Sequence, residues 1–199
     1  METFKTKTFE LGELKGISSK TIEEHLKLYA GYVKNTNSIL EKIPEYRGYE
    51  KEDIFASYVV SELGRRFSFE YNGMRNHEVY FSSLSGVATP ISLGLLKETI
   101  EKSFGSIDNF LSNFKTLAMT RGIGWAVLSY DKKEKILITS WIDEQHLGQL
   151  NGCEMILALD MWEHSYYLDY IPSEKKKYIE AFFTNLNWEV IENNFNSCF

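Results

Sequence analysis

The chain has 199 residues, 43% of them hydrophobic and 25% charged, as in an ordinary globular protein with one large core or two smaller ones. The formal net charge of −6 argues against a nucleic-acid partner, because phosphate rewards clustered lysine and arginine. No apolar run approaches the roughly 18 residues of a membrane span, and no signal peptide is apparent. We therefore expect a cytoplasmic protein without a membrane partner. Its two cysteines, Cys153 and Cys198, fit a reducing compartment.

Helical periodicity dominates the first half of the chain. Apolar residues recur every three or four positions over residues 18–40, and a polar stretch containing Pro44 then breaks the pattern. A second helical run covers residues 53–85, where Gly64 and Gly73 suggest an interruption into more than one helix. This half predicts an α-hairpin.

The second half changes from helical to strand-like periodicity and back. The expected elements are helices at residues 94–103 and 107–120, strands at 124–130, 136–141 and 154–160, and a final helix at 174–193. The predicted fold class is α+β, with an N-terminal helical hairpin followed by a C-terminal domain of helices packed on a small, three-stranded antiparallel sheet. We place the domains at residues 1–90 and 91–199, with a metal site between them.

Four residues form the sharpest chemical pattern. Asp160 and His164 follow the last predicted strand and can aim an oxygen and a nitrogen at one point. His25 lies on the apolar side of the first helix, and His77 lies in an aromatic stretch of the second. A buried imidazole needs a hydrogen-bond partner or a metal, and any one of these histidines taken alone is more often a core or interface residue. Together, three imidazoles and a carboxylate suit iron or manganese better than zinc.

Several segments resemble one known family. Residues 158–170, ALDMWEHSYYLDY, closely resemble the signature of iron/manganese superoxide dismutases, in which D-x-W-E-H supplies two ligands and a bridging glutamate. Residues 17–37 and 72–81 are similar to the family's first-ligand helix and second-ligand segment. Residues 114–128 and 187–195 resemble the segment entering the sheet and the closing helix. The resemblance implies an enzyme that converts superoxide into dioxygen and hydrogen peroxide by one-electron cycling of a mononuclear metal.

The resemblance also implies roles for individual residues. One iron or manganese ion per subunit would be held by His25, His77, Asp160 and His164. The other implied site residues are the gateway Tyr32, the pocket-wall residues Trp125 and Trp162, and the interface residues Glu163 and Tyr167. Glu163 would reach across a two-fold axis to His164 of the other subunit, so we expect a homodimer or a tetramer.

The choice of metal depends on a glutamine. Gly73 stands where iron-type members often carry a glutamine, and Gln145 falls near the place where manganese-type members carry theirs. The pattern leans towards manganese. His146 is the rival for this position, with Glu144 a third choice. With Tyr32, the glutamine would orient solvent at the metal and tune the metal's potential.

The first helix departs from the family pattern. Residues 25–32 are one residue shorter than in the family and lack its second histidine, whose place is taken by Leu28 or Tyr29. Tyr167 would lose that histidine as its partner across the dimer, and Lys175 sits where an entrance arginine is common. This departure motivates two other functions: a structural or sensing metal-binding dimer with weak or altered redox activity, and a mononuclear iron oxidase acting on another small substrate.

Overall fold

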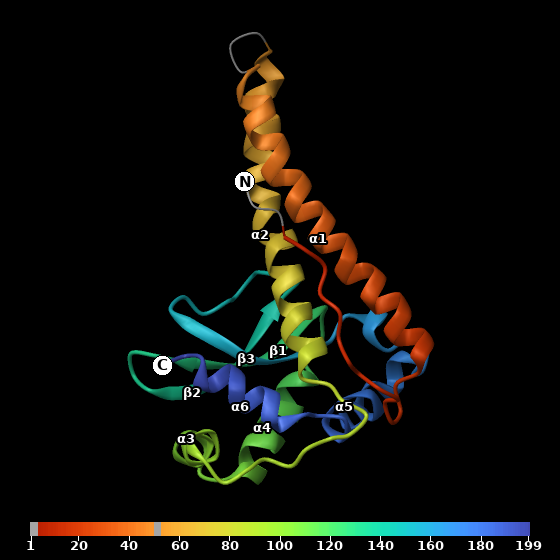
Figure 1. Cartoon of the computed structure of the whole chain (residues 1–199), viewed down its shortest axis with the longest axis vertical. Coiled ribbons are helices and arrows are strands. Elements are labelled where there is room, and N and C mark those ends of the chain that lie inside the picture. Colours follow the sequence, from red (N-terminus) through yellow and green to blue (C-terminus); the bar gives the residue numbers. More distant parts are fainter. Residues whose placement is uncertain (1–3, 50–52) are drawn as a thin grey trace.

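A long helical hairpin stands on a body of shorter helices and a small sheet (Figure 1). The computed structural model describes residues 4–49 and 53–199. The hairpin consists of α1 (Ser19–Arg47) and α2 (Ile54–Ser82), and the lower end of α2 lies against the sheet. Among the described residues, no helix is both long and apolar enough to cross a membrane.

The helix α1 is longer than the sequence predicts, and α2 is more regular. The Ser18 hydroxyl caps α1 by accepting a hydrogen bond from the backbone N–H of Thr21. The helix then passes through Pro44, which removes only one intrahelical donor, so the predicted end near residue 40 is wrong. The predicted interruption of α2 is also wrong, because Gly64 and Gly73 both lie inside one continuous helix.

The body supplies the rest of the predicted architecture. Its elements are α3 (Leu95–Phe104), α4 (Ile107–Ala118), β1 (Gly124–Asp131), β2 (Ile136–Asp143), β3 (Cys153–Asp160), α5 (Lys175–Thr184) and α6 (Trp188–Asn196). The three strands form an antiparallel sheet in the order β2-β1-β3. The predicted α+β class, with a helical hairpin ahead of helices on a small sheet, is confirmed.

The predicted single C-terminal helix is instead two helices. Asn185 lies between them, and its side chain accepts a hydrogen bond from the backbone N–H of Lys15 and donates one to its carbonyl, both at 2.8 Å. The break therefore holds the N-terminal segment against the body.

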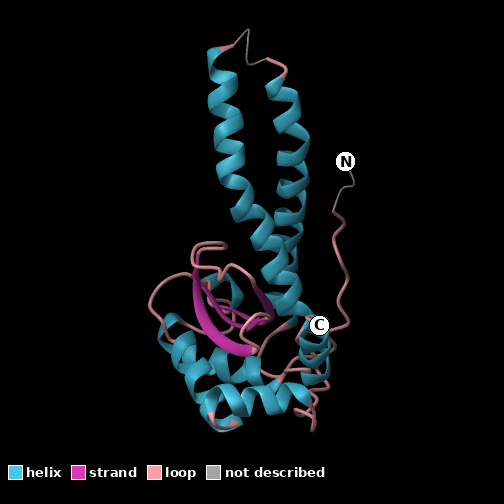
Figure 2. Cartoon of the chain, turned by 90° about the vertical axis from the view of Figure 1, so that its left-hand side faces the viewer, coloured by secondary structure: helices cyan, strands magenta, loops and turns pink. Residues whose placement is uncertain are grey.

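The central strand β1 is covered on both faces. Trp125 points towards α2, where its ring centroid lies 4.9 Å from that of His77. Tyr130, on the opposite face, lies 5.0 Å from Phe195 of α6. Figure 2 shows the sheet between the hairpin and the short helices of the body. One buried core takes residues from the hairpin and from the body, so the division at residues 90 and 91 stays a prediction.

Candidate metal centre

The four predicted ligands converge from four parts of the fold. His25 comes from α1, His77 from α2, Asp160 from the end of β3, and His164 from the short turn that follows. One possible ligand atom from each lies within 4.8 Å of the others. Asp160 Oδ2 lies 3.0 Å from His25 Nε2, 3.3 Å from His164 Nε2 and 3.6 Å from His77 Nε2. A single carboxylate oxygen therefore faces three imidazole nitrogens.

The end of β3 fixes both C-terminal members of this group. Asp160 pairs with Trp125 of β1, which sets its register. Its Oδ1 atom accepts a hydrogen bond from the backbone N–H of Trp162 at 2.8 Å, which leaves Oδ2 to the histidines. The Ser165 hydroxyl donates to the Asp160 carbonyl at 3.0 Å and closes the turn that carries His164. Residues 160–165 therefore form a turn that is closed by hydrogen bonds to Asp160.

The protonation states at the centre follow from burial and proximity. Burial lowers the pKa of His77 to about 3 and also lowers that of His25, so both rings are neutral near pH 7. Burial alone would raise the pKa of Asp160. The imidazoles of His164 and His25 outweigh it and hold that pKa well below its usual range. The centre therefore presents an ionised carboxylate beside the neutral imidazoles of His25 and His77.

The tautomer of His77 tests whether this centre fits a cation. His77 Nδ1 lies 2.6 Å from the Gly73 carbonyl, which can only accept, so Nδ1 carries the hydrogen. In a neutral ring, Nε2 is then a bare lone pair facing the Asp160 carboxylate. Within the described part of the chain this atom is buried without a hydrogen-bond partner, as is His25 Nδ1. A lone pair facing an anion is unfavourable unless a cation lies between them. The three nitrogens and one oxygen fit iron or manganese.

A second cluster lies beside the ligands. Gln145 is fully buried, and its Oε1 atom accepts a hydrogen bond from Trp125 Nε1 at 2.9 Å. Its Nε2 atom donates to Tyr32 Oη, also at 2.9 Å. The Tyr32 ring lies 5.0 Å from that of His77. The Gln145 amide therefore connects the Trp125 indole of β1 with the Tyr32 phenol of α1, next to the ligand His77.

Helix geometry explains why Tyr32 reaches this place. Seven residues separate it from His25, close to two turns of an α-helix, so both side chains leave the same face of α1. A Cβ atom at Gly73 would lie 2.5 Å from the Tyr32 ring, so the glycine of α2 makes room for it. Burial raises the pKa of Tyr32, as do the carboxylates of Asp160 and Glu70, which keeps the phenol protonated.

The other predicted residues of the β2–β3 turn point elsewhere. The His146 ring packs against Phe69 at 5.7 Å. Glu144 has a positive φ of 53°, and its carbonyl accepts a hydrogen bond from Trp162 Nε1 at 3.0 Å. The Trp162 ring in turn stacks on His164 at 5.8 Å. Of the three alternatives for the glutamine position, Gln145 is the one bonded to Tyr32.

The predicted interface residues lie on the surface beside His164. Glu163 is exposed, Tyr167 is 54% exposed, and the His164 side chain is 20% exposed. Lys175 is half-buried and donates to the Thr120 carbonyl at 2.8 Å. Glu163 directly precedes His164 in the chain, and Glu163 and Tyr167 are both open to solvent.

Sequence reasoning missed two buried residues at the centre. Asn76 precedes His77, and its amide donates to the Gln145 backbone carbonyl at 3.0 Å, which fixes the turn to α2. Tyr80 packs its ring 5.0 Å from that of His25. The position of Asn76 directly before the ligand His77 was the available signal for the first.

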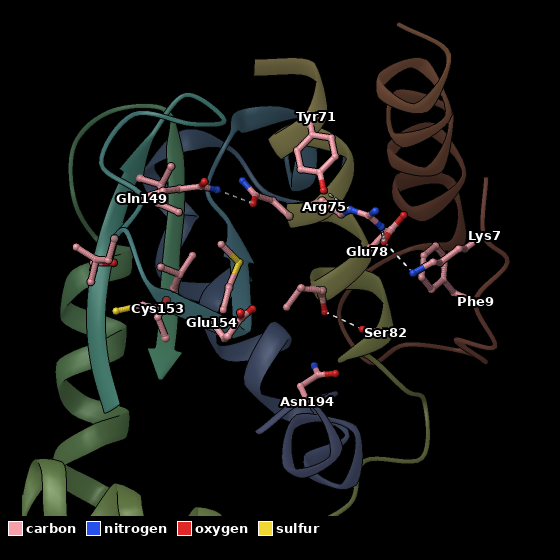
Figure 3. A pocket seen from close by; sticks show the side chains of 18 residues that line it. Lys7, Phe9, Tyr71, Arg75, Glu78, Ser82, Gln149, Cys153, Glu154 and Asn194 are labelled. Carbon is pink, nitrogen blue, oxygen red and sulfur yellow. Dashed lines mark hydrogen bonds and ion pairs between the residues drawn. The ribbon is translucent and has the colours of Figure 1, made fainter. Parts of the chain in front are cut away.

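A cavity of about 560 Å³ lies on the other side of α2. Figure 3 shows Arg75 and Glu78 of α2 on one wall and Cys153 of β3 on the other. None of the predicted site residues lines it. Asn76 lines this cavity, where its Oδ1 atom accepts a hydrogen bond from Gln149 at 3.4 Å, and its amide also bonds the Gln145 carbonyl beside the metal centre.

Comparison with known proteins agrees with this geometry. The family model for iron/manganese superoxide dismutases, C-terminal domain, matches residues 92–194. An iron superoxide dismutase of Aquifex pyrophilus is 34% identical over 188 residues, covering 92% of this chain and 85% of the relative. A mitochondrial manganese superoxide dismutase of Glossina morsitans morsitans is 32% identical, with 94% and 85% covered. A manganese superoxide dismutase of Mycobacterium leprae is 33% identical, with 86% and 80% covered.

Proposed function

The chain belongs to the iron/manganese superoxide dismutase family, and on that premise we propose how its residues divide the work of the enzyme. The reaction consumes two superoxide anions and two protons and yields dioxygen and hydrogen peroxide. The observation that carries the proposal is the group of three imidazoles, two of them fully buried, around the buried Asp160 carboxylate. His25, His77, Asp160 and His164 would hold one metal ion. When bound, the ion supplies the one-electron couple that both halves of the reaction need.

Tyr32 would donate a proton to the reaction, and Gln145 would orient the Tyr32 hydroxyl. Gln145 Nε2 donates to Tyr32 Oη, so the hydroxyl hydrogen of Tyr32 stays free to be donated to a small anion at the open side of the centre. Trp125 and Trp162 would exclude water, because their rings pack on His77 and His164. These contacts support Tyr32 and Gln145 as catalytic residues and the two tryptophans as walls of the pocket.

We propose manganese as the preferred metal. Gly73 leaves no room for a side chain next to Tyr32, and Gln145 reaches Tyr32 and Trp125 from the β2–β3 turn instead. This is the arrangement that the resemblance associates with manganese-type members. Metal-free protein reconstituted separately with each metal should regain more activity with manganese. Equal or greater recovery with iron would contradict this preference.

We also propose a homodimer formed across the His164 surface. Glu163 of one subunit would accept a hydrogen bond from His164 of the other and orient its ring. The exposed Tyr167, Leu168 and Ile171 beside it support an interface there. Light scattering of the Glu163→Ala variant should show a weaker dimer and less bound metal. A stable dimer that retains all its metal would contradict the assignment.

A tetramer needs a second contact surface, for which the hairpin offers one candidate. Ile54, Phe55 and Tyr58 at the start of α2 are strongly exposed, which supports an additional interface at the hairpin tip. The cytoplasm remains our proposed location, supported by the two free thiols Cys153 and Cys198.

The central test pairs elemental analysis with superoxide consumption, measured on one preparation. About one iron or manganese ion per subunit, with activity that disappears on chelation and returns on reconstitution, is the expected result. Bound metal without superoxide consumption would favour the sensing dimer or an oxidase of another substrate. Absence of both metals, together with failure to reconstitute, would refute the ligand assignment.

A further inference from the structure

A stripe of side chains leads outward from the metal centre along α2. From His77 and Gly73, the stripe runs to Glu70, Phe69 and Arg66, towards the start of α2. Glu70 and Phe69 lie three and four residues before Gly73, and Arg66 lies three and four residues before that pair, so all five share one face of the helix. Glu70 lies one turn beyond the glycine that receives the Tyr32 ring. The stripe therefore continues outward from the centre on the side of Tyr32.

Contacts across the hairpin confirm this placement. The Phe69 ring lies 6.0 Å from the Tyr32 ring. Glu70 accepts a hydrogen bond from the Asn35 amide of α1 at 3.1 Å. Asn35 follows Tyr32 by three residues and lies on the same face of α1. The two helices therefore place an aromatic ring and a carboxylate directly beyond the phenol.

The charges in this layer are ordered from inside to outside. Arg66 Nε donates to Glu70 Oε1 at 3.0 Å, and the Arg66 guanidinium lies 3.6 Å above the Phe69 ring. The Glu70 side chain is 7% exposed, whereas that of Arg66 is 45% exposed. The pair therefore presents its cation to solvent and keeps its carboxylate inside, near Tyr32.

The substrate is an anion, and the whole chain carries a net charge of −6. The protein as a whole repels superoxide, so its entry depends on a local cation. The buried Glu70 carboxylate near Tyr32 would add to this repulsion if it were not neutralised. Arg66 is in contact with both that carboxylate and the aromatic ring that borders Tyr32.

We propose that Arg66 guides superoxide into the centre by masking Glu70 and giving the approach beside Tyr32 a positive outer edge. This inference rests on the proposed role of Tyr32 at the open side of the centre. Arg66 acts on association, before any chemical step, so it affects kcat/KM and leaves kcat unchanged.

A series of charge variants tests the proposal. Pulse radiolysis would measure kcat and kcat/KM for Arg66→Gln, Glu70→Gln and the double variant, at ionic strengths of about 0.01 M and about 0.15 M. Arg66→Gln should lower kcat/KM about twofold at low ionic strength, as expected for one charge acting across roughly 10 Å of water. Glu70→Gln should raise it by a similar factor, and the double variant should return close to the parent value.

Arg65→Gln is the matched control. Arg65 is adjacent to Arg66 and pairs with Glu62 on an exposed face of α2. Its substitution by glutamine changes the net charge by the same amount as Arg66→Gln. Its kcat/KM should change less than that of Arg66→Gln, and all differences should shrink at the higher ionic strength.

Equal effects of Arg66→Gln and Arg65→Gln would overturn the proposal, since only net charge would then matter. A fall in kcat/KM for Glu70→Gln at full metal content would overturn it as well. If Arg66→Gln does not retain metal, Glu70→Gln alone decides, because the predicted rise requires a stable protein. A parent protein that binds metal but does not consume superoxide would refute the proposed function instead.

Discussion

The substitution Gly73→Ala tests the contact on which the Tyr32–Gln145 arrangement depends. Alanine is favoured over glycine inside a helix by about 1 kcal/mol, which by itself would stabilise α2. At Gly73, however, the new Cβ would lie 2.5, 2.7 and 2.9 Å from three atoms of the Tyr32 ring. Such overpacking typically costs about 1–3 kcal/mol, so we expect a net loss of roughly 0–2 kcal/mol.

Relief of this clash requires the Tyr32 ring to move. The ring cannot shift without stretching the 2.9 Å hydrogen bond from Gln145 to its hydroxyl, so superoxide turnover should fall at unchanged metal content. Gly64→Ala is the matched control, because an added Cβ there meets no atom within 4 Å. That variant should gain about 1 kcal/mol and keep full activity.

Urea denaturation of the metal-free variants at one protein concentration would measure the difference, expected to be about 1–3 kcal/mol between the two alanine variants. Superoxide consumption of the metal-loaded variants would give the second readout. A Gly73→Ala variant that is as stable as Gly64→Ala and as active as the parent would show that the Tyr32 ring does not pack against Gly73 of α2.

Three further predictions concern the ligands and the first helix. Asp160→Asn removes the carboxylate that faces three imidazoles. Elemental analysis should then show the metal content falling from about one ion per subunit to near zero. Retained metal would contradict the ligand assignment. The metal-free protein should lose stability as the pH falls below 6.5, because His77 then binds a proton in the unfolded chain but not in the folded one, where its pKa is about 3. We expect the free energy of unfolding to fall by about 2 kcal/mol at pH 5. A urea midpoint that does not change between pH 7.5 and pH 5 would refute this prediction. Tyr29→Phe should lower the free energy of unfolding by about 1 kcal/mol, because the Tyr29 hydroxyl accepts a hydrogen bond from the Lys7 backbone N–H and donates one to Glu78. The pH profile of turnover should stay the same, and a changed profile would show that Tyr29 takes part in proton transfer.

The ligand set was predictable because its residue types carry the chemistry. Asp160 and His164 stand in one short motif, and His146 is the one histidine of the chain outside the ligand set. The contacts around Gln145 were not predictable in the same way. Its partner Tyr32 is 113 positions away, and the direction of its side chain depends on a turn in which Glu144 adopts a positive φ. Sequence could name three alternatives there, and the backbone geometry distinguishes them.

Element boundaries were predicted wrongly where a local sequence signal did not decide the course of the backbone. Pro44, Gly64 and Gly73 are helix breakers by propensity, yet the hairpin helices pass through all three. At Gly73 the reason is visible, because the glycine admits an aromatic ring from the facing helix. The division of the last helix depends on Asn185 binding a backbone segment 170 residues earlier, which no window of sequence contains.

The uninterrupted path of α1 from His25 to Tyr32 limits how this protein can evolve. Substitutions between the two residues change the surface of the helix, but an inserted or deleted residue would rotate Tyr32 by about 100° around the axis and away from Gln145. A longer chain could restore the alignment only by accommodating the extra residue in a bulge. In this segment a change of length therefore needs a compensating bulge, whereas a change of residue type does not.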